Sequence, residues 1–320
     1  MDGGNDTREQ AYAADIASIR QAQLRIEPYI HRTPVLSSEN LNKLSKKKLF
    51  FKSECFQKGG AFKMRGACNA IFSLDDDRAA RGVLTHSSGN HAGALALAAK
   101  LRGIPAYIII PNNAPQCKVE NPTMQSRELV AGRVQEETGA VLVHPYNDRH
   151  IISGQGTVAL ELLDQVPEID TIIVPISGGG LISGVALAAK AINPSIRILA
   201  AEPSGADDVA QSKAAGEIIT LAEVNTIADG LRSTLGSLTW PVVRDLVDDV
   251  ITVEDEEIVE AMRLCYEILK VAVEPSGAIG LAAVLSDKFQ ASPAWESSHN
   301  IGIVLSGGNL DLSVLWESLR

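Results

Sequence analysis

The chain has 320 residues, of which 45% are hydrophobic, 21% are charged and only 4% are aromatic. This length suits two domains or one large α/β unit, and it excludes a small scaffold that depends on disulfides for its stability. The formal net charge of −10 disfavours a nucleic acid as partner, because an acidic surface repels phosphate backbones.

Short apolar runs alternate with longer stretches rich in Ala and Leu along the chain. We predict strands at these runs: Leu49–Glu54, Gly82–Thr85, Ala106–Ile110, Val141–Val143, Thr171–Ile176, Ile196–Ala201 and Asn300–Leu305. The stretches between them include three with helical spacing: His91–Leu101, Thr157–Leu163 and Leu181–Ala191. This alternation predicts right-handed crossovers and a doubly wound, mostly parallel sheet flanked by helices.

The most informative motif is Ser177-Gly178-Gly179-Gly180-Leu181, which directly follows a predicted strand. Ligands of open α/β sheets bind beyond the carboxyl ends of strands, where glycine-rich turns lead into helices. Successive glycines let backbone N–H groups approach an anion, and the helix N-terminus attracts negative charge. We therefore predict a phosphate site, with a tight packing turn as the alternative. The spacing matches neither the dinucleotide fingerprint nor the Walker motif, which disfavours a dehydrogenase or a nucleotidase.

Two further turns are expected at the same edge of the sheet. Ser87-Ser88-Gly89-Asn90-His91 lies between a predicted strand and a predicted helix, and Ser306-Gly307-Gly308-Asn309 follows the last predicted strand. Both would bring hydroxyl and amide groups to the ligand site. Either could also be an ordinary turn, because Ser, Gly and Asn are common in turns.

Lys63 stands between Phe62 and Met64 at an apparent helix start. Partial burial would lower the pKa of its amine and make it nucleophilic toward an aldehyde, while an ordinary surface lysine is the alternative. A reactive lysine combined with a phosphate site indicates pyridoxal phosphate, which needs an imine anchor and a phosphate anchor.

The segment Glu54-Cys55-Phe56-Gln57-Lys58-Gly59-Gly60-Ala61-Phe62-Lys63-Met64-Arg65-Gly66-Ala67 resembles the Schiff-base segment of fold-type II pyridoxal-phosphate enzymes. The three turns follow in the order of that family. Within it the chain is most similar to the serine racemases, the short relatives of threonine dehydratase, from about Asp15 onward. The resemblance implies an α/β fold similar to the tryptophan synthase β subunit, with two open, twisted, mostly parallel sheets flanked by helices.

The resemblance also implies roles for the motif residues. Lys63 would hold the cofactor as an imine and then act as a base at the substrate Cα, with Phe62 against the pyridine ring. Asn90 would bind the ring hydroxyl, and Ser306 would face the pyridine nitrogen. A hydroxyl does not enforce protonation of the ring, which limits delocalisation of the substrate carbanion into it. Loss of a β-hydroxyl would therefore compete well with the other fates of the carbanion. Backbone N–H groups of four residues would hold the phosphate: Gly178, Gly179, Gly180 and Leu181.

Ser88 separates two activities within this family. Racemisation needs acid/base groups on both faces of Cα, and Lys63 can serve only one. Family dehydratases typically have Ala where this chain has Ser88, so we expect Ser88 to serve the second face. Ser87, Gly89 and His91 would help to bind the substrate carboxylate. If Ser88 merely packs in its turn, the chain would be a serine/threonine dehydratase without significant racemisation.

A divalent-cation site is also implied by the resemblance. Glu202, Asp208 and the carbonyl oxygen of Ala206 match the family's site, directly after a predicted strand. Oxygen ligands favour Mg²⁺ or Ca²⁺ over zinc, and the cation would rigidify the strand-to-helix connection. A solvated acidic helix start is the alternative. The remaining histidines share no ligand spacing and are expected to be structural: His31, His86, His144, His150 and His299.

The chain departs from the family after Asn121, where about a dozen residues are missing, comparable to a turn and one strand. We expect a shortened small domain of residues 82–147, inserted into a large cofactor-binding domain of residues 1–81 and 148–320. Arg127 matches an arginine that contacts the substrate carboxylate in the racemases, and the gap puts this role in doubt. A catalytically impaired variant is therefore a further alternative.

The expected reaction interconverts L- and D-serine and eliminates water from serine, with threonine as a possible further substrate. The resemblance also implies a homodimer. We expect no activation by ATP, because Gly59 and Gly93 stand where mammalian relatives have a threonine and a glutamine that bind ATP. The cysteines lack C-x-x-C spacing, which is typical of a reduced protein: Cys55, Cys68, Cys117 and Cys265. With neither a targeting signal nor a long apolar run in the sequence, we expect a cytoplasmic protein that contacts no membrane.

Overall fold

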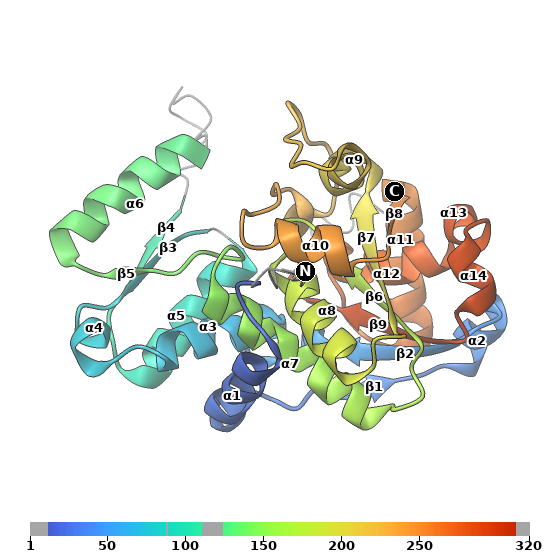
Figure 1. The fold of residues 1–320 in the computed structure, drawn as a ribbon, viewed down its shortest axis with the longest axis horizontal. Coiled ribbons are helices and arrows are strands. Elements are labelled where there is room, and N and C mark those ends of the chain that lie inside the picture. Colours follow the sequence, from blue (N-terminus) through green and yellow to red (C-terminus); the bar gives the residue numbers. More distant parts are fainter. Residues whose placement is uncertain (1–11, 88, 111–123, 312–320) are drawn as a thin grey trace, which may run out of the picture.

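The computed structural model describes residues 12–87, 89–110 and 124–311, and for residues 124–128 it describes the backbone alone. Two separate sheets form the framework, and helices pack on both faces of each (Figure 1). Within these described residues, every strand pair but one is parallel. The predicted α/β class with two mostly parallel sheets is confirmed.

The larger sheet joins the beginning and the end of the described chain. Its strands lie in the order β1 (Val35–Leu36), β2 (Lys48–Ser53), β9 (Asn300–Leu305), β6 (Thr171–Pro175), β7 (Arg197–Pro203) and β8 (Asp249–Val253). Two strands were not predicted, β1 and β8. Both lie at the edges of the sheet, where a strand is only partly buried and lacks the continuous apolar run of a central strand.

The two faces of the larger sheet carry separate cores. Along β6, Ile172 and Val174 point to one core and Ile173 to the other, as strand alternation requires. The first core is covered by α1 (Ile16–Ile26), α7 (Arg149–Gln165), α8 (Gly180–Ile192), α9 (Asp208–Ala215) and α10 (Trp240–Leu246). The second is covered by α2 (Glu39–Ser45), α11 (Asp255–Leu264), α12 (Pro275–Leu285), α13 (Asp287–Gln290) and α14 (Pro293–Ser297).

The smaller sheet lies to one side of the larger one (Figure 1). Its parallel strands have the order β4 (Ala106–Ile109), β3 (Val83–His86) and β5 (Val141–Leu142). Helix α6 (Met124–Thr138) contacts all three strands, and α5 (Asn90–Arg102) contacts β3 and β4. Helix α5 also packs on α3 (Lys63–Phe72), which ties the smaller sheet to the lysine segment. All these strands fall within residues 82–147, and the proposed division into domains stays a prediction.

Short segments complete the described chain: helix α4 (Asp76–Ala80), 3-10 turns at Glu27–Tyr29, Glu54–Phe56, Lys58–Gly60, Ser204–Ala206 and Asp229–Leu231, and a π-helical turn at Cys265–Leu269. Among the residues with a described position, no helix is long and apolar enough to cross a membrane.

Candidate active site

A cleft of about 810 Å³ lies where the strands of both sheets end. Residues that follow β3, β6 and β9 line it, together with the first residues of α3, α5 and α8. The three predicted turns and Lys63 therefore meet in one cavity, although they are far apart in the sequence. This is the place where open α/β sheets bind ligands.

The glycine turn forms one wall of the cleft. Gly179 adopts a left-handed conformation with φ of +85° just before α8. A side chain at Gly178 would place its Cβ 2.4 Å from the ring of Tyr146, which leaves room only for glycine. The backbone hydrogen bonding of α8 begins with the N–H of Ser183, which donates to the carbonyl of Gly179 at 2.9 Å. Earlier N–H groups of the helix have no acceptor within it, and they can bind an anion such as phosphate.

Lys63 is the first residue of α3, and its side chain lines the cleft. The Nζ atom donates a hydrogen bond to the carbonyl of Pro145 at 2.9 Å and lies 5.1 Å from the ring centroid of Phe62. Burial lowers the pKa of the amine to about 8, although the carboxylate of Glu274 acts in the opposite direction. A substantial fraction of the amine is therefore neutral near pH 8, and only the neutral amine is nucleophilic.

Asn90 is held by a chain of polar contacts. Its Nδ2 donates to Oε1 of Glu274 at 2.7 Å, and its Oδ1 accepts from Nδ2 of Asn309 at 2.8 Å. Burial, assisted by the charge of Asp229, raises the pKa of Glu274 to about 7. Ser306 is also buried in this wall, and its hydroxyl donates to the carbonyl of Ser276 at 3.2 Å.

Sequence reasoning missed Glu274. The available signal was a glutamate directly before a proline, a pair that here forms the N-terminus of α12. That pattern indicates a helix cap and says nothing of a partner 184 residues away in the sequence.

The second turn also lines the cleft. Ser87, Gly89 and His91 line the cleft, while Ser88 itself lies outside the described residues. The side chain of Arg127 is likewise outside the described part, so its expected contact stays a prediction.

His91 is buried beside the cleft in its neutral form. Burial, with the charge of Lys63 as a lesser cause, lowers its pKa to about 3. Its Nε2 lies 3.2 Å from the carbonyl of Val143, and this contact requires the proton on Nε2. The buried Nδ1 has no hydrogen-bond partner and then presents a lone pair. This arrangement does not favour the expected contact between His91 and a substrate carboxylate.

Of the histidines that we expected to be structural, one lines the cleft and a second packs against residues that line it. His86 lines it, and the ring of His144 packs edge-on against both His86 and Tyr146, with ring centroids 5.6 and 4.6 Å apart. The Nδ1 of His144 accepts the N–H of Asn147 at 2.9 Å. These contacts support Tyr146, which covers the glycine turn.

The expected cation ligands are adjacent and buried. The side chains of Glu202 and Asp208 and the residue Ala206 are at most 4% exposed. Burial raises the pKa of Glu202 to about 8 and that of Asp208 to about 6, in both cases helped by neighbouring carboxylates. The Oδ2 of Asp208 is buried without a hydrogen-bond partner, although the N–H groups of Val209 and Ala210 donate to Glu202 at 2.8 and 2.9 Å.

These groups fit a hard divalent cation, which would satisfy the orphaned oxygen and both buried carboxylates. The site has only two acidic side chains and a backbone carbonyl. In the described part of the chain, no group of three or more His, Cys, Asp or Glu side chains is placed to hold a metal.

Comparison with known proteins identifies the family. The family model described as pyridoxal-phosphate dependent enzyme matches residues 26–307. The chain belongs to the pyridoxal-phosphate dependent enzymes, among the serine racemases. It is 71% identical to the serine racemase of rice, with 99% of this chain and 97% of the rice protein aligned. It is 49% identical to the human serine racemase, over 95% and 94% of the two chains.

The fold agrees with this membership. The structure of maize serine racemase has 71% sequence identity to this chain and a TM-score of 0.93, covering 96% of this chain and 97% of the maize chain. The predicted family and the predicted enzyme class are therefore confirmed. The rice alignment extends over 329 residues, more than the 320 of this chain, so at least nine aligned positions have no residue here.

The cleft fits the cofactor of this family. At one point the cleft offers the amine of Lys63, whose pKa is lowered. At another point it offers the N–H groups of the glycine turn, where only glycine fits at position 178. Pyridoxal phosphate needs both an amine and an anion site.

Proposed function

We propose that this chain interconverts L- and D-serine and also eliminates water from L-serine to give pyruvate and ammonia. The observation that carries the proposal is the position of the Lys63 amine in the same cleft as the glycine turn and the turn that contains Ser88. The high identity to the plant serine racemases over nearly the whole chain supports the choice of serine as substrate.

Pyridoxal phosphate, when bound, would supply the electron-withdrawing group that makes the Cα–H bond of an amino acid acidic. The N–H groups of residues 178–181 would bind its phosphate, and Asn90 and Ser306 would orient its ring. In this cleft, the Nζ atom of Lys63 would remove the Cα proton on one face. The hydroxyl of Ser88 would deliver a proton on the other face, which inverts the stereocentre.

Glu274 would keep Asn90 in place through their 2.7 Å hydrogen bond. Elimination needs only the Lys63 face, followed by protonation of the departing hydroxyl. A dehydratase activity on serine or threonine is therefore expected beside racemisation.

We also propose that Glu202, Asp208 and the carbonyl of Ala206 hold Mg²⁺ or Ca²⁺, on the support of the orphaned Asp208 oxygen. A homodimer without ATP activation follows from the resemblance and stays a prediction, as does the cytoplasmic location.

The first experiment is an absorption spectrum of the purified chain with pyridoxal phosphate, followed by addition of L-serine. We expect a visible band that L-serine perturbs, with pyruvate and D-serine as products. Lys63→Ala should remove the protein-bound band and all turnover. A band without turnover would indicate the impaired variant, and a bound band that persists in Lys63→Ala would contradict the role of Lys63.

Ser88→Ala tests which of the two activities needs the second face. We expect it to abolish racemisation and turnover of D-serine while L-serine dehydration stays within about threefold of wild type, because Lys63 alone serves elimination. Chiral chromatography of serine and a coupled assay for pyruvate measure the two reactions. Ser87→Ala is the matched control, a neighbouring hydroxyl that should leave the ratio of the two activities unchanged. Equal loss of both reactions in Ser88→Ala would show a structural role instead.

A further inference from the structure

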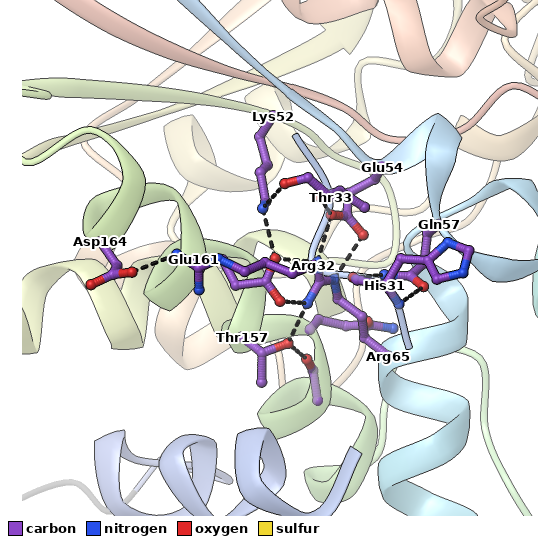
Figure 2. A network of polar contacts seen from close by, with 12 residues as sticks. His31, Arg32, Thr33, Lys52, Glu54, Gln57, Arg65, Thr157, Glu161 and Asp164 are labelled. Atoms are coloured by element: carbon purple, nitrogen blue, oxygen red, sulfur yellow. Dashed lines mark hydrogen bonds and ion pairs between the residues drawn. The ribbon is translucent and has the colours of Figure 1, made fainter. Parts of the chain in front are cut away.

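A buried network of charged side chains lies beneath the segment that carries Lys63 (Figure 2). Its centre is Arg65, which follows Lys63 by two residues and has no exposed surface. Buried charges are costly unless paired and hydrogen-bonded, so a network of this kind needs a reason. None of its members lines the cleft.

The guanidinium of Arg65 binds Glu54 through two parallel hydrogen bonds. Nε donates to Oε2 and Nη2 donates to Oε1, both at 2.7 Å. Glu54 is also fully buried, and its Oε1 accepts a further bond from the hydroxyl of Thr33 at 2.6 Å. A planar guanidinium and a carboxylate in this bidentate geometry fix each other in orientation as well as in distance.

Glu54 and Arg65 bracket the lysine segment. The chain between them, residues 55–64, contains two short turns and the left-handed Gly59 and Gly60, both with φ of +75°. The middle of this segment is fixed to the residues after β9, because the N–H of Phe62 donates to the carbonyl of Ser306 at 3.0 Å and the N–H of Gly308 donates to the carbonyl of Gly60 at 2.9 Å. The buried network acts instead at its two ends, Glu54 and Arg65. The bidentate pair joins them directly, and we call Glu54 and Arg65 the clasp.

Helix α7 anchors the clasp from the other side. Figure 2 shows the guanidinium of Arg65 between the carboxylates of Glu54 and Glu161. Nη1 and Nη2 donate to the two oxygens of Glu161 at 2.7 and 2.8 Å, and Nη1 also contacts the hydroxyl of Thr157 at 3.1 Å. Burial by itself would raise the pKa of Glu161, but its bonds from Arg65 overcome this and lower it, so the carboxylate stays charged.

We propose that the clasp of Glu54 and Arg65 is a positioning device for Lys63, which holds the amine where it can bind the cofactor and reach the substrate Cα. This inference rests on the proposed role of Lys63. A shift of about 1 Å in a reacting group can lower the rate about a hundredfold. A small displacement of the lysine segment would therefore lower kcat.

The same network contains a matched control that lies before the lysine segment. Lys52, on β2, is fully buried and donates to Glu161, to Gln165 and to the carbonyl of Thr33 at 2.7 to 2.9 Å. Lys52→Met removes a buried charge from the same network, as Glu54→Gln does, but Lys52 takes no part in the two bonds between Glu54 and Arg65. A purely structural network would respond alike to both changes.

The experiment compares Glu54→Gln and Arg65→Lys with Lys52→Met in the full-length chain loaded with pyridoxal phosphate. Glu54→Gln keeps the shape of the side chain, and Arg65→Lys keeps its charge, but neither can form the bidentate pair. We measure the rate of cofactor release from its visible absorbance, the pH at which that absorbance changes, kcat and KM for L-serine, and the melting temperature of the cofactor-free chain.

We expect both clasp variants to release the cofactor at least about tenfold faster than wild type and to lose at least about tenfold in kcat, with KM nearly unchanged. In both clasp variants, the pH at which the visible absorbance of the bound cofactor changes should also differ from that of wild type. Lys52→Met should lower the melting temperature as well, yet release the cofactor within about twofold of the wild-type rate.

Equal cofactor release from Lys52→Met and the clasp variants, or wild-type release from Glu54→Gln, would overturn the proposal. If Arg65→Lys fails to fold, Glu54→Gln decides alone. Failure of the proposed function looks different, because Lys63→Ala would then keep the protein-bound visible band.

Discussion

At the level of single residues, burial lowers the pKa of Lys63. The amine lies in a cleft with the ring of Phe62 nearby, and the loss of hydration lowers its pKa from 10.5 to about 8. Glu274 opposes this shift only in part, because its own carboxyl group is buried and has a raised pKa of about 7. The two groups therefore titrate in neighbouring pH ranges, because the pKa of the carboxyl is about 7 and that of the amine about 8.

This shift predicts how fast the cofactor-free chain takes up pyridoxal phosphate. Only the neutral amine attacks the aldehyde, so the rate should rise with pH and level off above the pKa of Lys63, with a midpoint near 8. Stopped-flow absorbance measured between about pH 6 and pH 10 gives the profile, and Lys63→Ala supplies the background. A rate that still rises steeply at the upper end would mean that the amine has the pKa of an exposed lysine.

At the scale of elements, the connection between β7 and α9 is organised around two carboxylates. Glu202 is the buried, next-to-last residue of β7, and its carboxylate accepts the N–H groups of Val209 and Ala210 at the start of α9, while Asp208 begins that helix. The two acids lie together, and burial and neighbouring carboxylates raise the pKa of each. A divalent cation would remove their mutual repulsion.

We therefore expect Mg²⁺ or Ca²⁺ to stabilise the cofactor-free chain. A cation at a hundred times its Kd would add about 2.7 kcal/mol to the free energy of unfolding, which raises the melting temperature by several degrees. Asp208→Asn should remove this response, because it takes away the charge at the orphaned oxygen. Asp207→Asn is the control, since the adjacent Asp207 binds Gln211 instead. Equal responses of both variants to calorimetric titration with cation would contradict the site.

At the scale of the whole molecule, the two sheets differ in how well they are covered. The strands β6 and β9 of the larger sheet are almost entirely buried, whereas β4, at an edge of the smaller sheet, is only partly buried along its length. Nearby, Ile110 and Leu129 are 60% and 65% exposed. Apolar surface of this kind is what the loss of a strand would leave behind.

This exposure predicts binding of a hydrophobic dye at the smaller sheet. Replacing Ile110 by Thr together with Leu129 by Gln should lower the fluorescence of bound dye and delay aggregation, with the cofactor band unchanged, because both residues lie outside the cleft. Leu24→Gln is the control, since Leu24 is 73% exposed but lies on α1. If the control lowers dye binding just as much, the smaller sheet is not the exposed apolar face.

Local sequence patterns were enough to predict the parallel α/β framework, the glycine turn at the cleft and Lys63 as a residue of the same cleft. These features depend on local order: buried parallel strands are continuous apolar runs, and a turn with a positive φ at Gly179 requires glycine. The edge strands β1 and β8 escaped prediction because partial burial weakens that signal.

Which side chains meet in space depends on the tertiary fold. Three contacts join segments whose meeting no local sequence pattern predicts. They are the bond between Glu274 and Asn90, the contact of His91 with the carbonyl of Val143, and the clasp of Glu54 and Arg65. A buried polar group must find a partner wherever packing brings one, and sequence spacing does not record that encounter. For this reason the residues that line the cleft could be predicted from the sequence, whereas the buried network beneath the lysine segment could not.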